Sequence, residues 1–325
     1  MYLRAVILVL FMIVNAWSMG SLCYAADKPS LLVIRAHSKD FQDSMEGLSG
    51  ELSNDFAIHE LLLSNNLTVK DVEKKIREVS PKVVVLMDNK ATSLFKAYQS
   101  QQPGSAQPIP SVSIMGVFIN LSLKGIKNAT GISYEVPIVT SIVSLRAALD
   151  RPFSKVGIVH REILKEFLET NKTYCNREGV EIVNYEIPSE GDVSGKVKKY
   201  LKKCMKDDKV DAIWVPNDNN LLNSEMLQEV WLPFASKFKK PIIVGVEVLV
   251  NPKFNFGTFA VIPDHKSLGM QAAEKVFDIM DNNWQVESSA IDPPTSVYKV
   301  INFKQVKEWY GIGEDQLKNV DKIVK

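Results

Sequence analysis

The sequence predicts an α/β protein made of two doubly wound parallel-sheet lobes joined by a hinge. Short apolar strands and amphipathic helices alternate along the chain, which is typical of parallel sheets covered by helices on both faces. The alternation occurs twice, over stretches of about 100 residues each, a common size for one domain. Residues 83–87 form a continuous apolar run, as expected for a strand buried on both faces.

The predicted elements follow this alternation in order. In the first stretch we expect strands at 31–34, 56–63, 83–87 and 112–119, and helices at 69–79 and 91–99. In the remainder we expect strands at 155–159, 180–187, 211–215, 242–246, 259–262 and 297–301. The helices expected there are 138–149, 163–177, 193–205, 222–238 and 267–280, with a closing helix after the last strand.

The two stretches meet at 130–137, a segment that ends in Pro137. Proline suits the first turn of a helix because its missing N–H is not needed there. We therefore expect lobe one to comprise residues 27–134 and 258–290. Lobe two would comprise 135–257 and 291–325.

The N-terminus has the pattern of a secretory signal peptide, which we assign to residues 1–26. A short segment with one positive charge, Arg4, precedes an apolar run at 5–14 and small residues that end at Ala25 and Ala26. The apolar run has about ten residues, whereas a membrane-spanning helix needs about 20. We expect export to the periplasm with cleavage near Ala25 or Ala26; an uncleaved anchor is the alternative.

The cysteines leave two questions open. Cys23 lies near the position of a lipoprotein cysteine, but Leu22 occupies the place of the small residue that such a site needs. Cys175 and Cys204 would remain after cleavage, and an oxidising compartment permits a disulfide between them. Two separate core cysteines are the alternative, because sequence alone does not show whether they are close.

The charge balance narrows the class of partner. The 39 basic and 38 acidic residues give a net charge of +1 at pH 7. Nucleic acids and anionic membranes both call for a basic excess, so we expect neither as a partner. The lysines of 193–206 are interpreted as a solvated helix face.

The sequence lacks the motifs of common catalytic and cofactor sites. The four histidines are not paired at metal-ligand spacing, and no Cys-x-x-Cys or His-Glu-x-x-His occurs. Glycine-rich phosphate loops and a Gly-x-Ser-x-Gly elbow are also absent. We therefore expect a small-molecule binding protein without a cofactor or metal, and not an enzyme.

Polar residues at the carboxyl ends of the predicted strands are the candidate ligand contacts. Ligands bind at these ends in open parallel sheets, and two facing lobes would bring both sets to one cleft. The candidates in lobe one are His37, Ser38, Asn89, Met115 and Gly116. The candidates in lobe two are His160, Arg161, Asp218, Asn219 and Glu247.

These candidates have structural alternatives. Asn89, with the aspartate before it, could only cap the following helix, and Arg161 could be solvated. Asp218 and Asn219 follow the apolar strand 211–215 directly, which favours ligand contact over capping. Glu247 follows the strand 242–246 in the same way.

Three segments between residues 128 and 273 resemble those of one protein family. Residues 128–133 (Asn-Ala-Thr-Gly-Ile-Ser) are similar to its Asn-Val-Thr-Gly-Val-Ser signature, and residues 210–219 to its Asp-Ala-Ile-Tyr-Val-Pro-x-Asp-Asn block. Residues 264–273 resemble its Asp-Tyr-Tyr-x-Leu-Gly-x-Gln-Ala-Ala helix, with His265 and Lys266 in place of the paired tyrosines. The family is the tryptophan-binding-like ABC transporter substrate-binding proteins, which have the type I periplasmic binding fold.

The resemblance implies a clamp that closes on a small molecule, with an amino acid as the candidate ligand. Its hinge segments would lie near Ser133, Ala260 and Asp292. An amino-acid ammonium group needs a carboxylate, which Asp218 or Glu247 could supply. Ser133, beside a helix start, could bind the ligand carboxylate.

Two roles fit such a clamp equally well in the sequence. It could deliver solute, as a monomer, to an ABC permease, or it could report ligand to a membrane sensor. No motif marks the docking surface, so both roles stay open. An exported hydrolase is a third role, which would need a nucleophile–base pair or a metal site.

Overall fold

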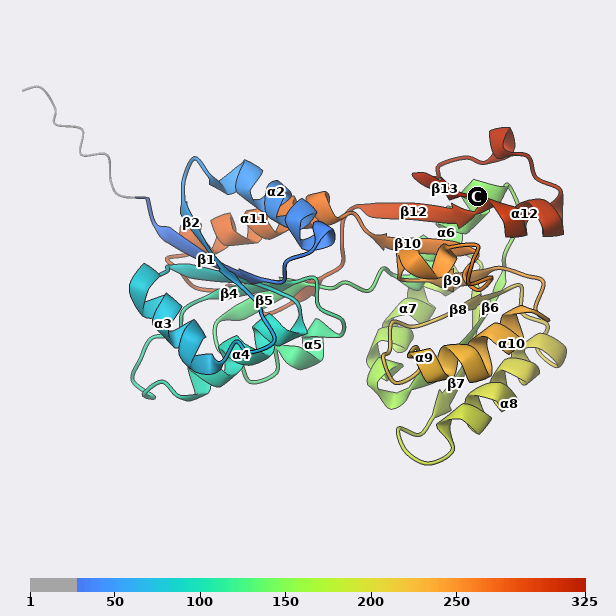
Figure 1. The fold of residues 1–325 in the computed structure, drawn as a ribbon, viewed down its shortest axis with the longest axis horizontal. Coiled ribbons are helices and arrows are strands. Elements are labelled where there is room, and N and C mark those ends of the chain that lie inside the picture. Colours follow the sequence, from blue (N-terminus) through green and yellow to red (C-terminus); the bar gives the residue numbers. More distant parts are fainter. Residues whose placement is uncertain (1–27) are drawn as a thin grey trace, which may run out of the picture.

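The computed structural model describes residues 28–325, which form two α/β lobes joined by three crossing segments (Figure 1). This architecture confirms the predicted fold class. The predicted signal peptide and Cys23 lie outside the described residues. No helix within 28–325 is both long and apolar enough to cross a membrane.

Lobe one contains a parallel six-stranded sheet in the order β11-β5-β4-β3-β1-β2. Its strands are β1 (Ser30–Arg35), β2 (Ala57–Leu62), β3 (Val83–Met87), β4 (Ser111–Ile114), β5 (Ala129–Ile132) and β11 (Ile291–Asp292). Helices α2 (Lys39–Leu52) and α11 (His265–Asp281) cover one face. Helices α3 (Val69–Val79) and α4 (Asn89–Ser100) cover the other face, and the short α5 (Ile119–Ser122) follows β4.

Lobe two contains a seven-stranded sheet in the order β13-β12-β10-β9-β8-β6-β7. Its strands are β6 (Lys155–Arg161), β7 (Glu181–Ile187), β8 (Ala212–Trp214), β9 (Ile242–Val244), β10 (Phe259–Pro263), β12 (Val297–Asn302) and β13 (Lys322–Val324). Only the β10–β12 pair is antiparallel among these described strands. Helices α6 (Ile138–Leu149), α7 (Lys165–Arg177) and α12 (Phe303–Tyr310) cover one face, and α8 (Val193–Lys206), α9 (Ser224–Met226) and α10 (Leu232–Ala235) the other.

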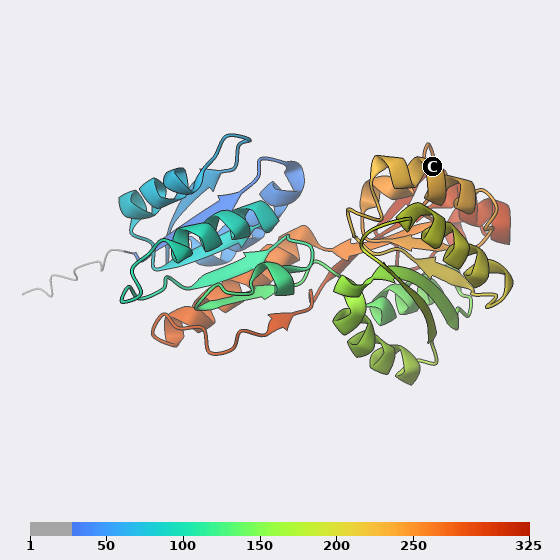
Figure 2. The ribbon, with the colours of Figure 1, turned by 90° about the horizontal axis from the view of Figure 1, so that it is seen from below.

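The three crossing segments lie between the lobes, as the view from below shows (Figure 2). They are residues 133–137, 263–265 and 292–297.

Two of the predicted lobe boundaries differ from this arrangement. Strand β10 pairs with β9 and β12 and so belongs to lobe two, and the chain crosses after Pro263 rather than near Ala260. Strand β11 pairs with β5 in lobe one, so the last crossing follows Asp292.

Two predicted elements end earlier or break. The strand expected at 112–119 ends at Ile114, because Met115 adopts a left-handed backbone conformation with φ of 62° that turns the chain. The helix expected at 222–238 consists of α9, a π turn at Leu227–Trp231 and α10. Pro233, at the start of α10, lacks the N–H that a continuous α-helix would use.

The cysteines of lobe two do not form a disulfide. Cys175 packs in the core between α7 and one face of the sheet, whereas Cys204 packs in the core under α8 on the other face. Burial raises the pKa of the Cys175 thiol to about 11 and that of Cys204 to about 12, so both are protonated core residues. The sheet itself separates them.

Candidate functional site

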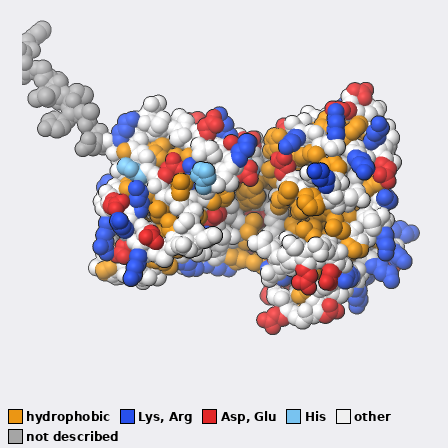
Figure 3. Space-filling view, viewed as in Figure 1, with side chains coloured by type: hydrophobic (Ala, Val, Ile, Leu, Met, Phe, Trp, Pro, Cys, Tyr) orange, Lys and Arg blue, Asp and Glu red, His pale blue; other side chains and the backbone are white. Residues whose placement is uncertain are grey.

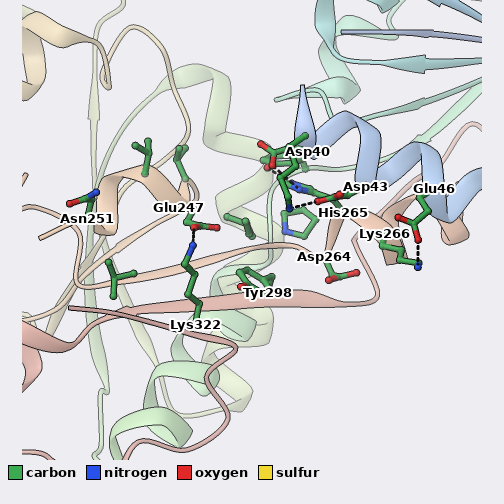
Figure 4. Close-up of a pocket in the computed structure, with 17 residues that line it drawn as sticks. Asp40, Asp43, Glu46, Glu247, Asn251, Asp264, His265, Lys266, Tyr298 and Lys322 are labelled. Atoms are coloured by element: carbon green, nitrogen blue, oxygen red, sulfur yellow. Dashed lines mark hydrogen bonds and ion pairs between the residues drawn. The ribbon is translucent and has the colours of Figure 1, made fainter. Parts of the chain in front are cut away.

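A cavity of about 840 Å³ lies between the lobes beside the crossing segments (Figure 4). One wall is the start of α2 in lobe one, with Lys39, Asp40 and Asp43. The opposite wall belongs to lobe two and includes the short helical turn at Glu247–Val250 and the strands β12 and β13. The crossing segments contribute Tyr134 and residues 263–266. Both lobes therefore shape this cavity.

Most carboxylates in this cavity already have a cation of their own. The pairs, measured from Nζ to a carboxylate oxygen, are Lys39–Asp43 (3.0 Å), Lys266–Glu46 (2.6 Å) and Lys322–Glu247 (2.6 Å). Asp264 caps α11 by accepting a hydrogen bond from the backbone N–H of Ser267. Glu247, predicted as a ligand contact, thus reaches the cavity but is paired with a lysine.

Asp40 has neither a lysine partner nor a capping role, and it lies next to a tyrosine–histidine pair. The hydroxyl oxygen of Tyr134 is 2.9 Å from Nε2 of His265, and the two rings stack with centroids 5.9 Å apart. Nδ1 of His265 faces the Asp40 carboxylate at 3.6 Å. Burial lowers the pKa of His265, so its imidazole is neutral at pH 7. Asp40, whose side chain is 63% exposed, therefore has no permanently charged partner among the described residues.

The strand ends of lobe two hold a buried ion pair. Nε and Nη2 of Arg161 donate to the two carboxylate oxygens of Asp218 at 2.6 and 2.7 Å. The Asp218 side chain is 2% exposed and also accepts a hydrogen bond from the N–H of Asn220. The expectation that Asp218 offers a free carboxylate is therefore wrong, because Arg161 occupies both oxygens. The pair instead fixes the guanidinium of Arg161 at the end of β6.

His160 lies in the core and not at the cleft, so its assignment as a cleft residue is wrong. Its side chain is buried, Nδ1 donates to the carbonyl oxygen of Arg161 at 2.9 Å, and Nε2 accepts from Asn184 at 3.1 Å. Burial lowers the pKa of His160, which keeps the ring neutral. A strand-end position does not decide which way a side chain points.

Three of the lobe-one candidates shape the loop after β4. Asn89 Nδ2 donates to the Val117 carbonyl at 2.8 Å, while the sulfur of Met115 accepts from the hydroxyl of Ser44 at 3.3 Å. A Cβ on Gly116 would lie 2.6 Å from Oδ1 of Asn89, so a larger residue there would displace the Asn89 side chain. These contacts make Asn89 and Gly116 scaffold residues of the loop.

Ser133 and Glu135 border a second hollow of about 460 Å³ on the other side of the first crossing segment. The Ser133 hydroxyl donates to the carbonyl oxygen and the carboxylate of Glu135 at 3.0 and 3.2 Å, and the N–H of Phe118 donates to the same carboxylate at 2.8 Å. Burial raises the pKa of Glu135. Ser133 thus binds its own crossing segment in this structure.

The remaining candidates are exposed. His37 and Ser38 lie between β1 and α2, and Asn219 follows β8. Asp40, Tyr134 and His265 line the cavity, but none of them was predicted as a ligand contact. The sequence did carry a signal for His265, because a histidine stands there in place of a tyrosine of the family motif.

No group of histidine, cysteine, aspartate and glutamate side chains within 28–325 is arranged to hold a metal ion.

The sequence matches no protein-family model and no curated protein with which it was compared. Solved structures are similar in fold. An ABC domain from Streptococcus pneumoniae in complex with L-Trp has a TM-score of 0.54 and 19% identity, covering 92% of this chain and 100% of that one. An open, ligand-free substrate-binding protein with adhesive properties from Clostridium difficile has a TM-score of 0.64 and 14% identity, covering 91% and 99%.

A conserved domain protein from Vibrio cholerae is also similar, with a TM-score of 0.52 and 15% identity, covering 91% of this chain and 100% of that one. These structures match almost the whole chain, including both lobes and the crossing segments. The chain therefore has the two-lobed type I fold of the periplasmic solute-binding proteins.

Proposed function

We propose that this chain is an extracytoplasmic solute-binding protein of an ABC importer, and that it captures an amino acid between its lobes. The observation that carries the proposal is the interlobe cavity, in which the exposed carboxylate of Asp40 has neither a permanent cation nor the capping role of Asp264. Export is supported by the signal-peptide pattern of residues 1–26. The fold supports binding rather than catalysis, because its solved neighbours include substrate-binding proteins.

Asp40 is the proposed partner of the ligand ammonium group, beside the stacked rings of Tyr134 and His265. The ligand carboxylate would lie at the start of α2. Ser38 supports this placement, because its exposed side chain makes no capping hydrogen bond and the first-turn N–H groups of a helix favour an anion.

Closure of the clamp would bring the lobe-two wall, with Glu247 and Lys322, toward the lobe-one wall at Lys39 and Asp40. A ligand that touches both walls binds the closed state more tightly than the open state, and this difference in affinity drives closure. The bending would occur in the crossing segments 133–137, 263–265 and 292–297.

A thermal-shift screen of the chain without residues 1–26 tests the proposal, since a bound ligand raises the melting temperature. We expect a shift with amino acids and none with sugars, nucleosides or dicarboxylates. Asp40→Asn should weaken binding at least tenfold, because a hydrogen bond to a charged group is lost. Asp43→Asn is the matched control, since Asp43 already pairs with Lys39. No shift with any amino acid, or equal effects of the two variants, would contradict the proposal.

A further inference from the structure

Helix α8 carries a continuous lysine face. Six of its 14 residues are lysines, and its first turn contains no acidic residue. They are Lys196, Lys198, Lys199, Lys202, Lys203 and Lys206, all exposed. At 100° per residue they fall within about 160° of the helix circumference. The buried residues Val197, Leu201 and Cys204 lie on the opposite side, so the lysine face points away from the lobe-two core.

No described carboxylate forms an ion pair with the lysine face, although Asp207 and Asp208 follow α8 directly and act electrostatically on Lys203. None of the six lysines is within 4.0 Å of a carboxylate oxygen of the described residues. Helix α3 in lobe one differs, since Lys74 and Arg77 there pair with glutamates on the same helix. Blue side chains gather accordingly at the lower right of Figure 3, over α8. The net charge of +1 therefore hides a strong local excess of positive charge.

Two tyrosines border the lysine face. Tyr185, on the edge strand β7, stacks on Tyr200 of α8 with ring centroids 4.7 Å apart and planes 6° from parallel. Nζ of Lys203 lies 4.8 Å from the centre of the Tyr185 ring, and Nζ of Lys199 lies 5.8 Å from that of Tyr200. The Tyr185 hydroxyl donates to the carboxylate of Asp208 at 2.8 Å. Tyrosine is enriched at membrane–water interfaces, where its ring lies in the headgroup region.

We propose that the lysine face of α8 binds the surface of a membrane that contains anionic phospholipids. Four to eight basic residues clustered on one helix are typical of such binding. The face carries no large apolar residue that could insert into the bilayer, so the attachment is electrostatic, peripheral and sensitive to salt. Helix α8 lies on the far side of lobe two from the crossing segments (Figure 1), so attachment leaves the cavity between the lobes accessible. This surface is separate from the solute site proposed above.

Co-sedimentation with lipid vesicles tests this inference. The chain without residues 1–26, which contains both complete lobes, is mixed with vesicles of 30% phosphatidylglycerol in phosphatidylcholine, or of phosphatidylcholine alone. We expect binding only to the anionic vesicles at about 50 mM salt, and its loss at about 500 mM salt. Replacing Lys196, Lys198, Lys202 and Lys206 by glutamine should weaken vesicle binding at least tenfold.

A matched variant controls for net charge. Lys70, Lys82, Lys124 and Lys127 are exposed lysines of lobe one, and their replacement by glutamine removes the same four charges from a different surface. This variant should keep its vesicle binding, and both variants should keep the melting temperature of the parent chain. Equal loss in the two variants would overturn the proposal, because binding would then follow net charge alone. Failure of the parent chain to bind anionic vesicles would also overturn it and would turn attention to an acidic protein surface as the partner of α8.

Discussion

Two carboxylates of lobe two, Asp218 and Glu247, differ in their partners from two carboxylates on the other side of the molecule, Asp40 and Glu135. In lobe two, Asp218 is buried and bidentately paired with Arg161, and Glu247 is paired with Lys322 at 2.6 Å. On the other side, Asp40 faces only a neutral histidine, and Glu135 is held by N–H and O–H groups. The two lobe-two carboxylates are neutralised by cations of their own lobe and Glu135 is satisfied by hydrogen bonds, so of these four only Asp40 remains open to a cationic group of a ligand.

The largest expected effect on stability comes from breaking the buried ion pair between Arg161 and Asp218 in lobe two. Arg161→Ala leaves the Asp218 carboxylate buried without its cation, which should lower the free energy of unfolding by about 3–5 kcal/mol. Lys322→Ala is the matched control, because Glu247 is 38% exposed and surface pairs contribute about 0–1 kcal/mol. Urea denaturation of both variants measures the difference. Equal and small losses would show that Asp218 is solvated.

The next effect tests how lobe one holds Asp40 in place. Helix α2 packs closely on α11, and a Cβ on Gly47 would overlap the carbonyl oxygen of Lys266. Gly47→Ala should therefore cost about 1–3 kcal/mol and displace the start of α2, which weakens ligand binding. Gly50→Ala, in the same helix but with open space around it, should instead stabilise by about 0.5–1 kcal/mol. Thermal unfolding measures the stability of both variants. Similar stabilities of Gly47→Ala and Gly50→Ala would contradict the close packing of α2 on α11.

The buried His160 and the partly buried His265 predict that the stability of the protein depends on pH. Burial lowers the pKa of His160 and His265 below the ordinary value of 6.5, so the unfolded chain binds protons more readily than the folded one. The two neutral histidines stabilise the folded chain fully above about pH 6.5, and this stabilisation is lost as the pH falls. We expect the free energy of unfolding to fall by about 1–2 kcal/mol between pH 7 and 5. His160→Gln should reduce this change in the free energy of unfolding with pH. An unchanged pH dependence in the variant would exclude His160 as its source.

The smallest effect concerns Glu135. Burial raises its pKa, so its carboxyl favours the folded state below its ordinary pKa of 4.5 and loses that contribution as the pH rises. Glu135→Gln should therefore raise the melting temperature by about 2 °C at pH 8. At pH 4.5 the variant and the parent chain should have the same melting temperature. Glu166→Gln, at an exposed position of the same hollow, serves as the control. A lower melting temperature of Glu135→Gln at pH 8 would show that the carboxylate is stabilised in the folded chain.

The sequence predicted most of the periodic parts of the fold, but not the 14-residue helix α2. Helix α3 and strand β3 have the expected bounds, because an amphipathic repeat and an unbroken apolar run are local signals. The strands β5, β11 and β13 were not predicted. They contain only two to four residues, and their partners come from distant parts of the chain.

The candidate site was harder to predict for a similar reason. The rule for strand ends placed Arg161 and Asp218 at one edge of the sheet, but the sequence does not show that two charges 57 residues apart neutralise each other. The contact of Asp40 with His265 depends on the packing of α2 against α11. Pattern reasoning locates charged residues; the tertiary structure decides which of them remain unpaired.

The return of the chain to lobe one has a consequence for the order of folding. Residues of α11 complete the core that begins with Leu31 in β1, and Lys266 pairs with Glu46 across 220 residues. Contacts between such distant residues form slowly, because a long loop must close first. Lobe one therefore cannot finish folding while only its first half has been synthesised. Under the export proposed above, this delay would keep lobe one unfolded, and so competent for translocation, until most of the polypeptide exists.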